Sequence, residues 1–279
     1  MKTNIVFSII IISLSFAFSS CNKDNKDYNT KAAENYALGE SMFSDIFKQV
    51  EDAALVQEDS ITNKGTKSTY SQFDKSCATL SITPFDLTTF PKTLVIDYGT
   101  TNCLCSDGRN RRGIINAVLT GWFRDSATVI TVTPNDYYLN DYKVEGTKTI
   151  TNNGHNTSGN LEFHILVNNG VITGAEGTST WNTNRIHEWI EGESTVFNPW
   201  DDVYLIRGTA NGITVEGEAY TMNTITDLRV EIGCRWIVSG ILNIDGENSY
   251  TIEVDYGNGN CDGIATITVN NYSINITMQ

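Results

Sequence analysis

Among the residues able to do covalent chemistry are six cysteines, and two of them end a motif that occurs twice. One copy occupies residues 97–103 and the other occupies residues 255–261, and both have the form D-Y-G-x-x-N-C. Cys77 lies 26 residues before the cysteine that ends the first copy, and Cys234 lies 27 residues before the cysteine that ends the second. Each copy closes a strand-like run. We therefore predict two β-hairpins, each joined near its open end by a disulfide.

The repeat also indicates which cysteine remains a thiol. Cys103 and Cys261 occupy the same position in the motif, whereas Cys105 has no counterpart. We therefore predict the disulfides Cys77–Cys103 and Cys234–Cys261. Apart from Cys21, which belongs to the N-terminal segment, this leaves Cys105 as the unpaired cysteine. Disulfides form and persist in oxidising compartments, so this pattern favours an exported protein.

The second hairpin carries a further prediction. Matching its apolar faces requires opposing positions whose numbers sum to an even value, such as Leu242 with Val254, whereas the two cysteines sum to an odd value. One extra residue within residues 257–260 would reconcile the two registers, and glycine permits the strained backbone of such a bulge.

Four side chains would share one face of an extended strand, and they could bind a ligand: Trp181, Arg185, His187 and Trp189. Exposed aromatic rings flanked by planar polar groups could stack on sugar rings. The alternative is that these tryptophans cover the core of a β domain, where large aromatic side chains usually lie, and it is the favoured interpretation.

The sequence predicts no cofactor, no metal site and no catalytic residue. The three histidines lack zinc-site spacing. Residues 255–262 resemble a calcium loop in composition but not in spacing, and a disulfide-closed turn explains the same residues. A hydrolase remains an alternative, because the separation of two catalytic carboxylates is a three-dimensional quantity.

The N-terminal residues have the layout of a secretory signal peptide over residues 1–20, with a charged start and a short apolar run. The small residues just before Cys21 resemble a bacterial lipobox, although Phe18 departs from its usual Leu, Val or Ile. The resemblance implies cleavage before Cys21 and acylation of its sulfur and amine. The alternative is an ordinary cleaved signal peptide, with Cys21 incidental.

The charge balance of the mature chain limits its partners. Removal of residues 1–20 takes away one lysine, so 18 Lys and Arg remain against 33 Asp and Glu, a net charge of −15. A field of this sign repels nucleic acid and anionic lipid headgroups. We therefore expect membrane attachment through the lipid alone and no nucleic-acid partner. Residues 21–30 are polar and predict a flexible tether.

Residues 31–56 predict an amphipathic helix, because Tyr36, Phe43, Phe47 and Val50 recur at helical spacing. This helix either packs on the following domain or binds a partner. Residues 57–76 show no periodic pattern of apolar residues, which predicts a linker.

Residues 77–279 predict a single antiparallel β domain, because β-branched and aromatic residues alternate with polar ones. Short turns between consecutive strands are expected at residues 134–136, 168–170, 210–212 and 270–271. The expected fold is mostly β, an antiparallel meander forming a rolled sheet, a barrel or a sandwich, with one N-terminal helix.

Four stretches of this domain carry a resemblance to a family. They are V-I-D-Y-G at residues 95–99, S-D-G-R-N-R-R-G at 106–113, V-E-G-T-K-T at 144–149 and C-R-W-I-V-S-G at 234–240. In combination they resemble the uncharacterised secreted lipoproteins of Bacteroidetes, over roughly residues 77–279. The resemblance implies a habitat and an export route but no activity. Charged residues after Cys21 also resemble the signal that sends some of these lipoproteins to the cell surface.

We therefore expect a non-enzymatic lipoprotein of the cell envelope, placed in the outer membrane, with a structural or binding role. A carbohydrate-binding surface lipoprotein is the alternative, and a hydrolase is the third. Expected partners are the membrane, through the lipid anchor, and a glycan or another envelope protein.

Overall fold

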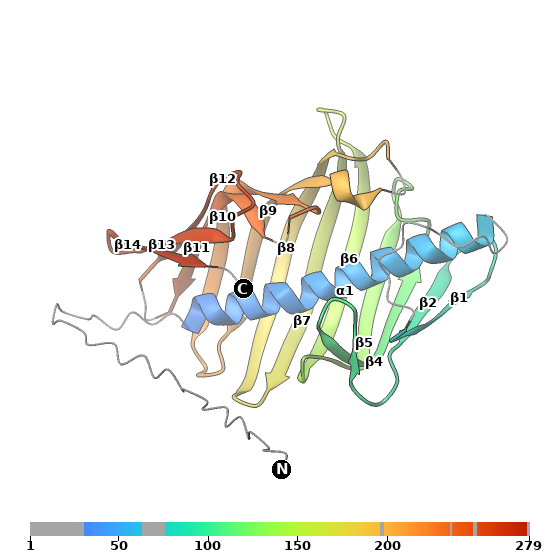
Figure 1. Ribbon diagram of the computed structural model, residues 1–279, viewed down its shortest axis with the longest axis horizontal. Coiled ribbons are helices and arrows are strands. Elements are labelled where there is room, and N and C mark those ends of the chain that lie inside the picture. The colour runs from blue at the N-terminus through green and yellow to red at the C-terminus, as the bar shows by residue number, and fades with distance from the viewer. Residues whose placement is uncertain (1–30, 63–75, 196–197, 235, 248–249, 278–279) are drawn as a thin grey trace, which may run out of the picture.

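A computed structural model describes residues 31–62, 76–195, 198–234, 236–247 and 250–277. Within them, fourteen strands form one antiparallel sheet that curls around a single long helix (Figure 1). The predicted mostly-β fold with one N-terminal helix is confirmed. The predicted signal peptide, the tether and Cys21 lie outside the described residues.

The sheet is a meander in which consecutive strands are neighbours, apart from β3, which pairs only with β4. It is not closed, because β1 and β14 lie at opposite ends of the strand order. The predicted barrel is therefore excluded for the described chain, and the open sheet is consistent with the other two predicted forms, a rolled sheet or a sandwich. The strands are β1 (Thr79–Thr83), β2 (Lys92–Asp97), β3 (Cys103–Leu104), β4 (Asn110–Leu119), β5 (Val129–Leu139), β6 (Tyr142–His155), β7 (Leu161–Gly174), β8 (Gly177–Glu191), β9 (Val203–Ile213), β10 (Ala219–Glu231), β11 (Ile237–Gly246), β12 (Ile252–Asn258), β13 (Ile264–Val269) and β14 (Tyr272–Thr277), and a short 3-10 helix, η1 (Pro199–Asp201), precedes β9.

One of the four predicted turns is confirmed, and three are wrong. Asn270 and Asn271 join β13 to β14 with φ angles of 49° and 65°. The other three segments, 134–136, 168–170 and 210–212, lie inside β5, β7 and β9. The first two coincide with shifts in strand register. Residues that permit a turn also permit a bulge, and strands paired on both sides continue through such a site.

The helix α1 (Lys31–Thr62) crosses the concave face of the sheet (Figure 1). It begins where predicted but continues six residues further, so residues 57–62 are helix and the predicted linker is wrong there. Its buried face, which includes the fully buried Phe43 and Ile46, packs on the sheet. Phe43 stacks on Trp181 with ring centroids 5.1 Å apart. Of the two roles expected for this helix, packing on the domain is the one that the structure shows.

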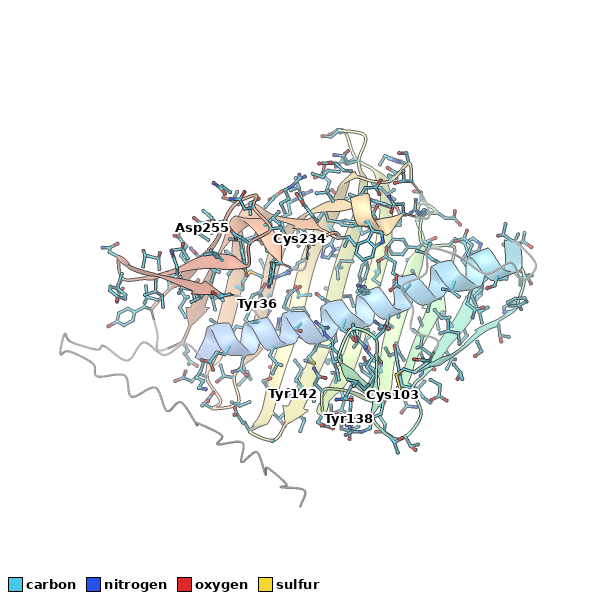
Figure 2. All side chains as sticks on the ribbon, viewed as in Figure 1. Tyr36, Cys103, Tyr138, Tyr142, Cys234 and Asp255 are labelled. Carbon is cyan, nitrogen blue, oxygen red and sulfur yellow. A yellow bond between two sulfur atoms is a disulfide. The ribbon has the colours of Figure 1, made fainter. Side chains whose placement is uncertain are left out.

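Both predicted disulfides are confirmed. Their Cα atoms are 5.6 Å apart in Cys77–Cys103 and 5.8 Å apart in Cys234–Cys261. Cys103 and Cys234 lie far apart along the sheet (Figure 2).

The bulge predicted in the second hairpin is also present. Ile241 lies opposite Asp255 whereas Ser239 lies opposite Asn258, so one extra residue is accommodated between Asp255 and Asn258.

Candidate functional site

The four side chains proposed as a ligand-binding stripe do share one face of β8, but the stripe is not exposed. The helix α1 contacts Trp181, Arg185 and His187, and Trp189 stacks on Tyr204 of β9. Trp181 and Trp189 are only 2% and 1% exposed, and Arg185 is also buried. His187 lies edge-on to Phe47 of the helix, with ring centroids 6.1 Å apart. The expectation of an exposed sugar-binding stripe is therefore corrected: both tryptophans belong to the core, as the alternative interpretation predicted.

Arg185 anchors the first half of the helix through charge. Its guanidinium forms an ion pair with Glu40, with Nη1 and Oε2 2.7 Å apart, and it donates a hydrogen bond to the Tyr36 hydroxyl. Tyr256, from the second copy of the repeated motif, lies close to this group. Burial raises the pKa of Tyr256 to about 12, and the negative charge of Glu40 contributes to the rise. Burial likewise lowers the pKa of His187, and the charge of Lys148 adds to this effect.

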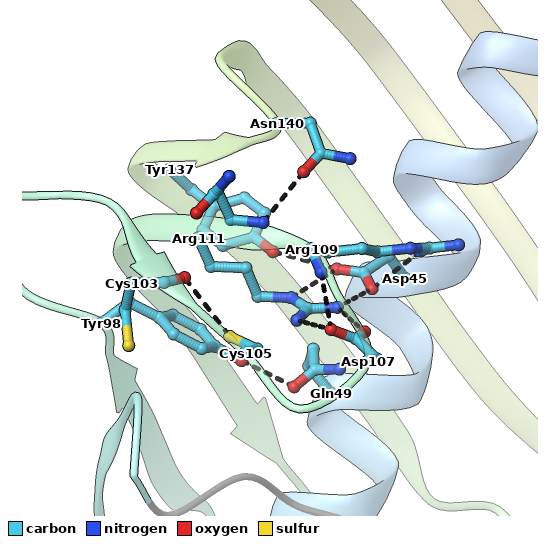
Figure 3. A network of polar contacts seen from close by, with 11 residues as sticks. Asp45, Gln49, Tyr98, Cys103, Cys105, Asp107, Arg109, Arg111, Tyr137 and Asn140 are labelled. Carbon is cyan, nitrogen blue, oxygen red and sulfur yellow. Dashed lines mark hydrogen bonds and ion pairs between the residues drawn. The ribbon is translucent and has the colours of Figure 1, made fainter. Parts of the chain in front are cut away.

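A second polar cluster surrounds Asp45, near the middle of the helix (Figure 3). Arg111 donates from Nε to Oδ2 at 3.2 Å and from Nη2 to Oδ1 at 2.5 Å. The Tyr137 hydroxyl donates to Oδ2 at 3.0 Å, and Arg109 donates to Oδ1 at 3.1 Å. The side chains of Asp45 and Arg111 are each only 2% exposed. This is a buried, charge-assisted contact in which four groups meet.

The loop before β4 completes the cluster. Asp107 accepts two hydrogen bonds from Arg111, at 2.9 Å and 2.6 Å, and Tyr98 of the first motif copy donates to Gln49 at 2.6 Å. The S-D-G-R-N-R-R-G stretch is therefore a clamp on the helix. The sequence did not predict this cluster. The one available signal was the position of Asp45, a charged residue beside the apolar stripe of the helix.

A cavity of about 340 Å³ adjoins the Asp45 cluster. Its lining carries charges of both signs, which suits a small polar ligand, and consists of Lys48, Gln49, Asp52, Cys105, Ser106, Asp107 and Arg111. Burial raises the pKa of Asp52 to about 6, although Lys48 opposes the rise. Cys105 forms no disulfide, as predicted, and its thiol is buried and donates to the Cys103 carbonyl at 3.7 Å. A buried thiol with a hydrogen-bonded proton is a poor nucleophile.

A second cavity, of about 440 Å³, lies at the rim of the sheet. Its lining combines Trp189 with acidic and polar groups and consists of Asn160, Trp189, Ile190, Glu191, Gly192, Glu193 and Ser194. The loop that follows this lining leads to η1, where Trp200 is 60% exposed. The Thr195 hydroxyl lies 2.9 Å from each carboxylate oxygen of Asp201, which ties the two segments together.

Two carboxyl groups that interact with the charge of Arg124 have raised pKa values. Burial raises the pKa of Glu51 on α1 to about 8, and its acidic neighbours Asp52 and Asp202 raise it further. Burial also raises the pKa of Asp202 to about 7, against the opposing charge of Arg124. The Arg124 guanidinium lies 4.6 Å from the centre of the Trp189 ring. Groups with such pKa values are suited to proton transfer, which is the chemistry that a hydrolase needs.

In residues 255–262, which resemble a calcium loop in composition, the two aspartates accept hydrogen bonds from backbone amides of the same turn. Asp255 accepts a hydrogen bond from the Gly257 amide at 2.8 Å, and Asp262 accepts one from the Ile264 amide at 3.0 Å. Within the described residues, no three His, Cys, Asp or Glu side chains gather in a way that could hold a metal ion.

No protein-family model, curated protein or solved structure matches this chain. In the part of the chain that the structure describes, no helix combines the length and the apolar character needed to cross a membrane.

Proposed function

We propose that the protein is a non-enzymatic lipoprotein of the cell envelope, held to the outer membrane by acylated Cys21, with a structural or binding role. The observation that carries this proposal is the filling of the concave face by α1. A rolled sheet would hold an internal ligand on that face, yet here Phe43 and Ile46 are fully buried in it. The two disulfides support residence in an oxidising compartment.

The position of the helix supports attachment close to the membrane. Lys31, where α1 begins, lies ten positions after Cys21. Fully extended, ten residues reach at most about 36 Å, so the folded body would stay near the bilayer surface.

Replacement of the acylated cysteine tests the proposal. Cys21→Ser should release the protein from the membrane fraction into the soluble fraction, and metabolic labelling with a fatty acid should be lost. Cys105→Ser is the matched control, because it also removes a thiol but leaves the N-terminus intact. Membrane fractionation of Cys21→Ser that is identical to wild type would refute lipid anchoring.

Carbohydrate binding is a second candidate, favoured by the rim cavity beside Trp189 and by the exposed Trp200. Binding on a glycan array that Trp200→Ala abolishes would support this candidate. Tyr250→Ala is the control, because Tyr250 is an exposed aromatic residue (50%) that lies away from this loop. Cleavage of the glycan that depends on Asp202 would instead indicate a hydrolase.

A further inference from the structure

The last two strands of the sheet form an edge without charge. β13 and β14 contain no Asp, Glu, Lys, Arg or His, although the mature chain has a net charge of −15. β14 is the terminal strand of the sheet, and in the described chain it pairs only with β13. Edge strands of natural proteins usually carry charges, prolines or bulges that prevent edge-to-edge pairing. This edge lacks the charges and the prolines.

The side chains of β14 are also unusually exposed. Five of its six residues are exposed, including Tyr272 at 60% and Ile274 at 45%. Ile274 lies opposite Ile267, and Tyr272 lies opposite the buried Val269, so the apolar face of β14 continues the core-facing side of the sheet. The opposite edge differs, because β1 buries Ile82 and is followed directly by Pro84.

We propose that β14 pairs antiparallel with β14 of a second copy of this chain, so that two rolled sheets join edge to edge about a two-fold axis. The register that places Ile274 opposite itself also places Tyr272 opposite Ile276 and Ser273 opposite Asn275. Each pair then joins like side chains on the same face. Apolar meets apolar and polar meets polar, and the core-facing side of both sheets stays continuous.

Electrostatics favours this edge over other surfaces of an acidic chain. The nearest strand that carries charge is β12, where Glu253 lies opposite Thr268 of β13, which in turn lies opposite Ser273 of β14. Five strand spacings would separate Glu253 from its copy, a distance of about 24 Å. The Debye length at physiological ionic strength is only about 8 Å, so this repulsion is screened.

The test is the molar mass of the mature chain carrying Cys21→Ser, measured by sedimentation velocity over a concentration series. We expect a dimer that dissociates on dilution. Ile274→Lys would place two lysines opposite each other, so we expect a monomer at every concentration. Ile213→Lys is the matched control, because Ile213 is 46% exposed at the end of β9, and this variant should keep the dimer. Equal thermal midpoints of the two variants would show that folding is intact.

A cysteine at the two-fold axis gives a second measurement. Directly opposed residues of antiparallel strands have Cα atoms roughly 4.5–5.5 Å apart, within the range that a disulfide requires. With Cys21 and Cys105 both changed to Ser, Ile274→Cys should form a covalent dimer under oxidation, and Ile213→Cys should not. A monomeric parent chain, a dimer that survives Ile274→Lys, open-ended oligomers, or equal cross-linking at both positions would each overturn the proposal.

Discussion

The strongest test of the helix clamp is the removal of the Asp45 carboxylate. Asp45→Ala leaves Arg111, whose side chain is only 2% exposed, without its buried partner. Breaking a buried ion pair by removing one member typically costs 3–5 kcal/mol. Arg111 retains Asp107, whose side chain is 45% exposed, so we take the lower end, about 3 kcal/mol. The lost hydrogen bond from Tyr137 adds about 1 kcal/mol.

We therefore expect the free energy of unfolding to fall by about 4 kcal/mol. For a protein of this size that loss corresponds to a drop of roughly 8–16 °C in the thermal midpoint. Urea denaturation followed by tryptophan fluorescence measures the change, and the slope with denaturant should stay that of the wild type. Glu34→Ala on the same helix is the control, because Glu34 is exposed and should leave the midpoint unchanged.

A double replacement separates two contributions to stability: the cost of leaving one buried charge unpaired, and the net stabilisation that the ion pair provides. Asp45→Leu combined with Arg111→Met replaces both buried charges by apolar groups, and such exchanges are often neutral. We expect the double variant to be clearly more stable than Asp45→Ala. A loss below about 1 kcal/mol for Asp45→Ala, or a double variant as unstable as the sum of its single changes, would refute the clamp.

Three further changes test other parts of the fold. Removing the Cys234–Cys261 disulfide by two serine replacements should lower the free energy of unfolding by about 3.5 kcal/mol. The two cysteines are 27 residues apart, and without the disulfide the unfolded chain regains the conformational entropy that this closed loop had removed. The raised pKa of Glu51, about 8, means that the folded protein holds a proton that the unfolded chain has released, so stability should fall as the pH rises from about 4.5 to about 8. Glu51→Gln should reduce this fall in a series of urea titrations. Gly39→Ala should destabilise by about 1–3 kcal/mol, although alanine favours helices, because the added Cβ would lie 2.4 Å from the Trp181 ring.

Matched controls accompany these changes. Cys105→Ser should leave non-reducing peptide maps unchanged, since Cys105 lies outside both disulfides. The exposed Glu253→Gln should retain the wild-type pH profile, and Ser44→Ala, at an exposed helix position, should not destabilise. The reasoning would be wrong if the cysteine double variant were as stable as wild type, if Glu51→Gln left the pH profile unchanged, or if Gly39→Ala raised the midpoint.

The covalent framework and the class of fold could be derived from the sequence, because both depend on local patterns. Alternation of apolar and polar residues defines strands, and the duplicated D-Y-G-x-x-N-C motif placed each cysteine at an equivalent point of a hairpin. The side chains of a strand alternate strictly between its two faces. The odd sum of the residue numbers of Cys234 and Cys261 therefore required one extra residue, the bulge beside Tyr256.

Local pattern failed where neighbouring strands decide the conformation. Asn168–Gly170 has the composition of a turn, yet β6 and β8 pair with this segment on both sides and the strand continues. Gly39 has low helix propensity as a sequence feature, but the packing of Trp181 against the helix requires it. The curvature of the sheet, and therefore the choice of a roll over a barrel, depends on such bulges and contacts.

The Asp45 clamp and the covering of Trp181 by α1 depend on contacts between residues far apart in the chain, as between Asp45 and Arg111 and between Phe43 and Trp181. A sequence shows that the two tryptophans of β8 lie on the same face of the strand, but it does not show which element covers that face. Only the tertiary structure decided this, because the helix fills the concave side of a sheet whose curl no single strand encodes. The sequence by itself determined the class of fold, the presence of one N-terminal helix and the disulfides, and the fold determined where strands continue and which side chains meet.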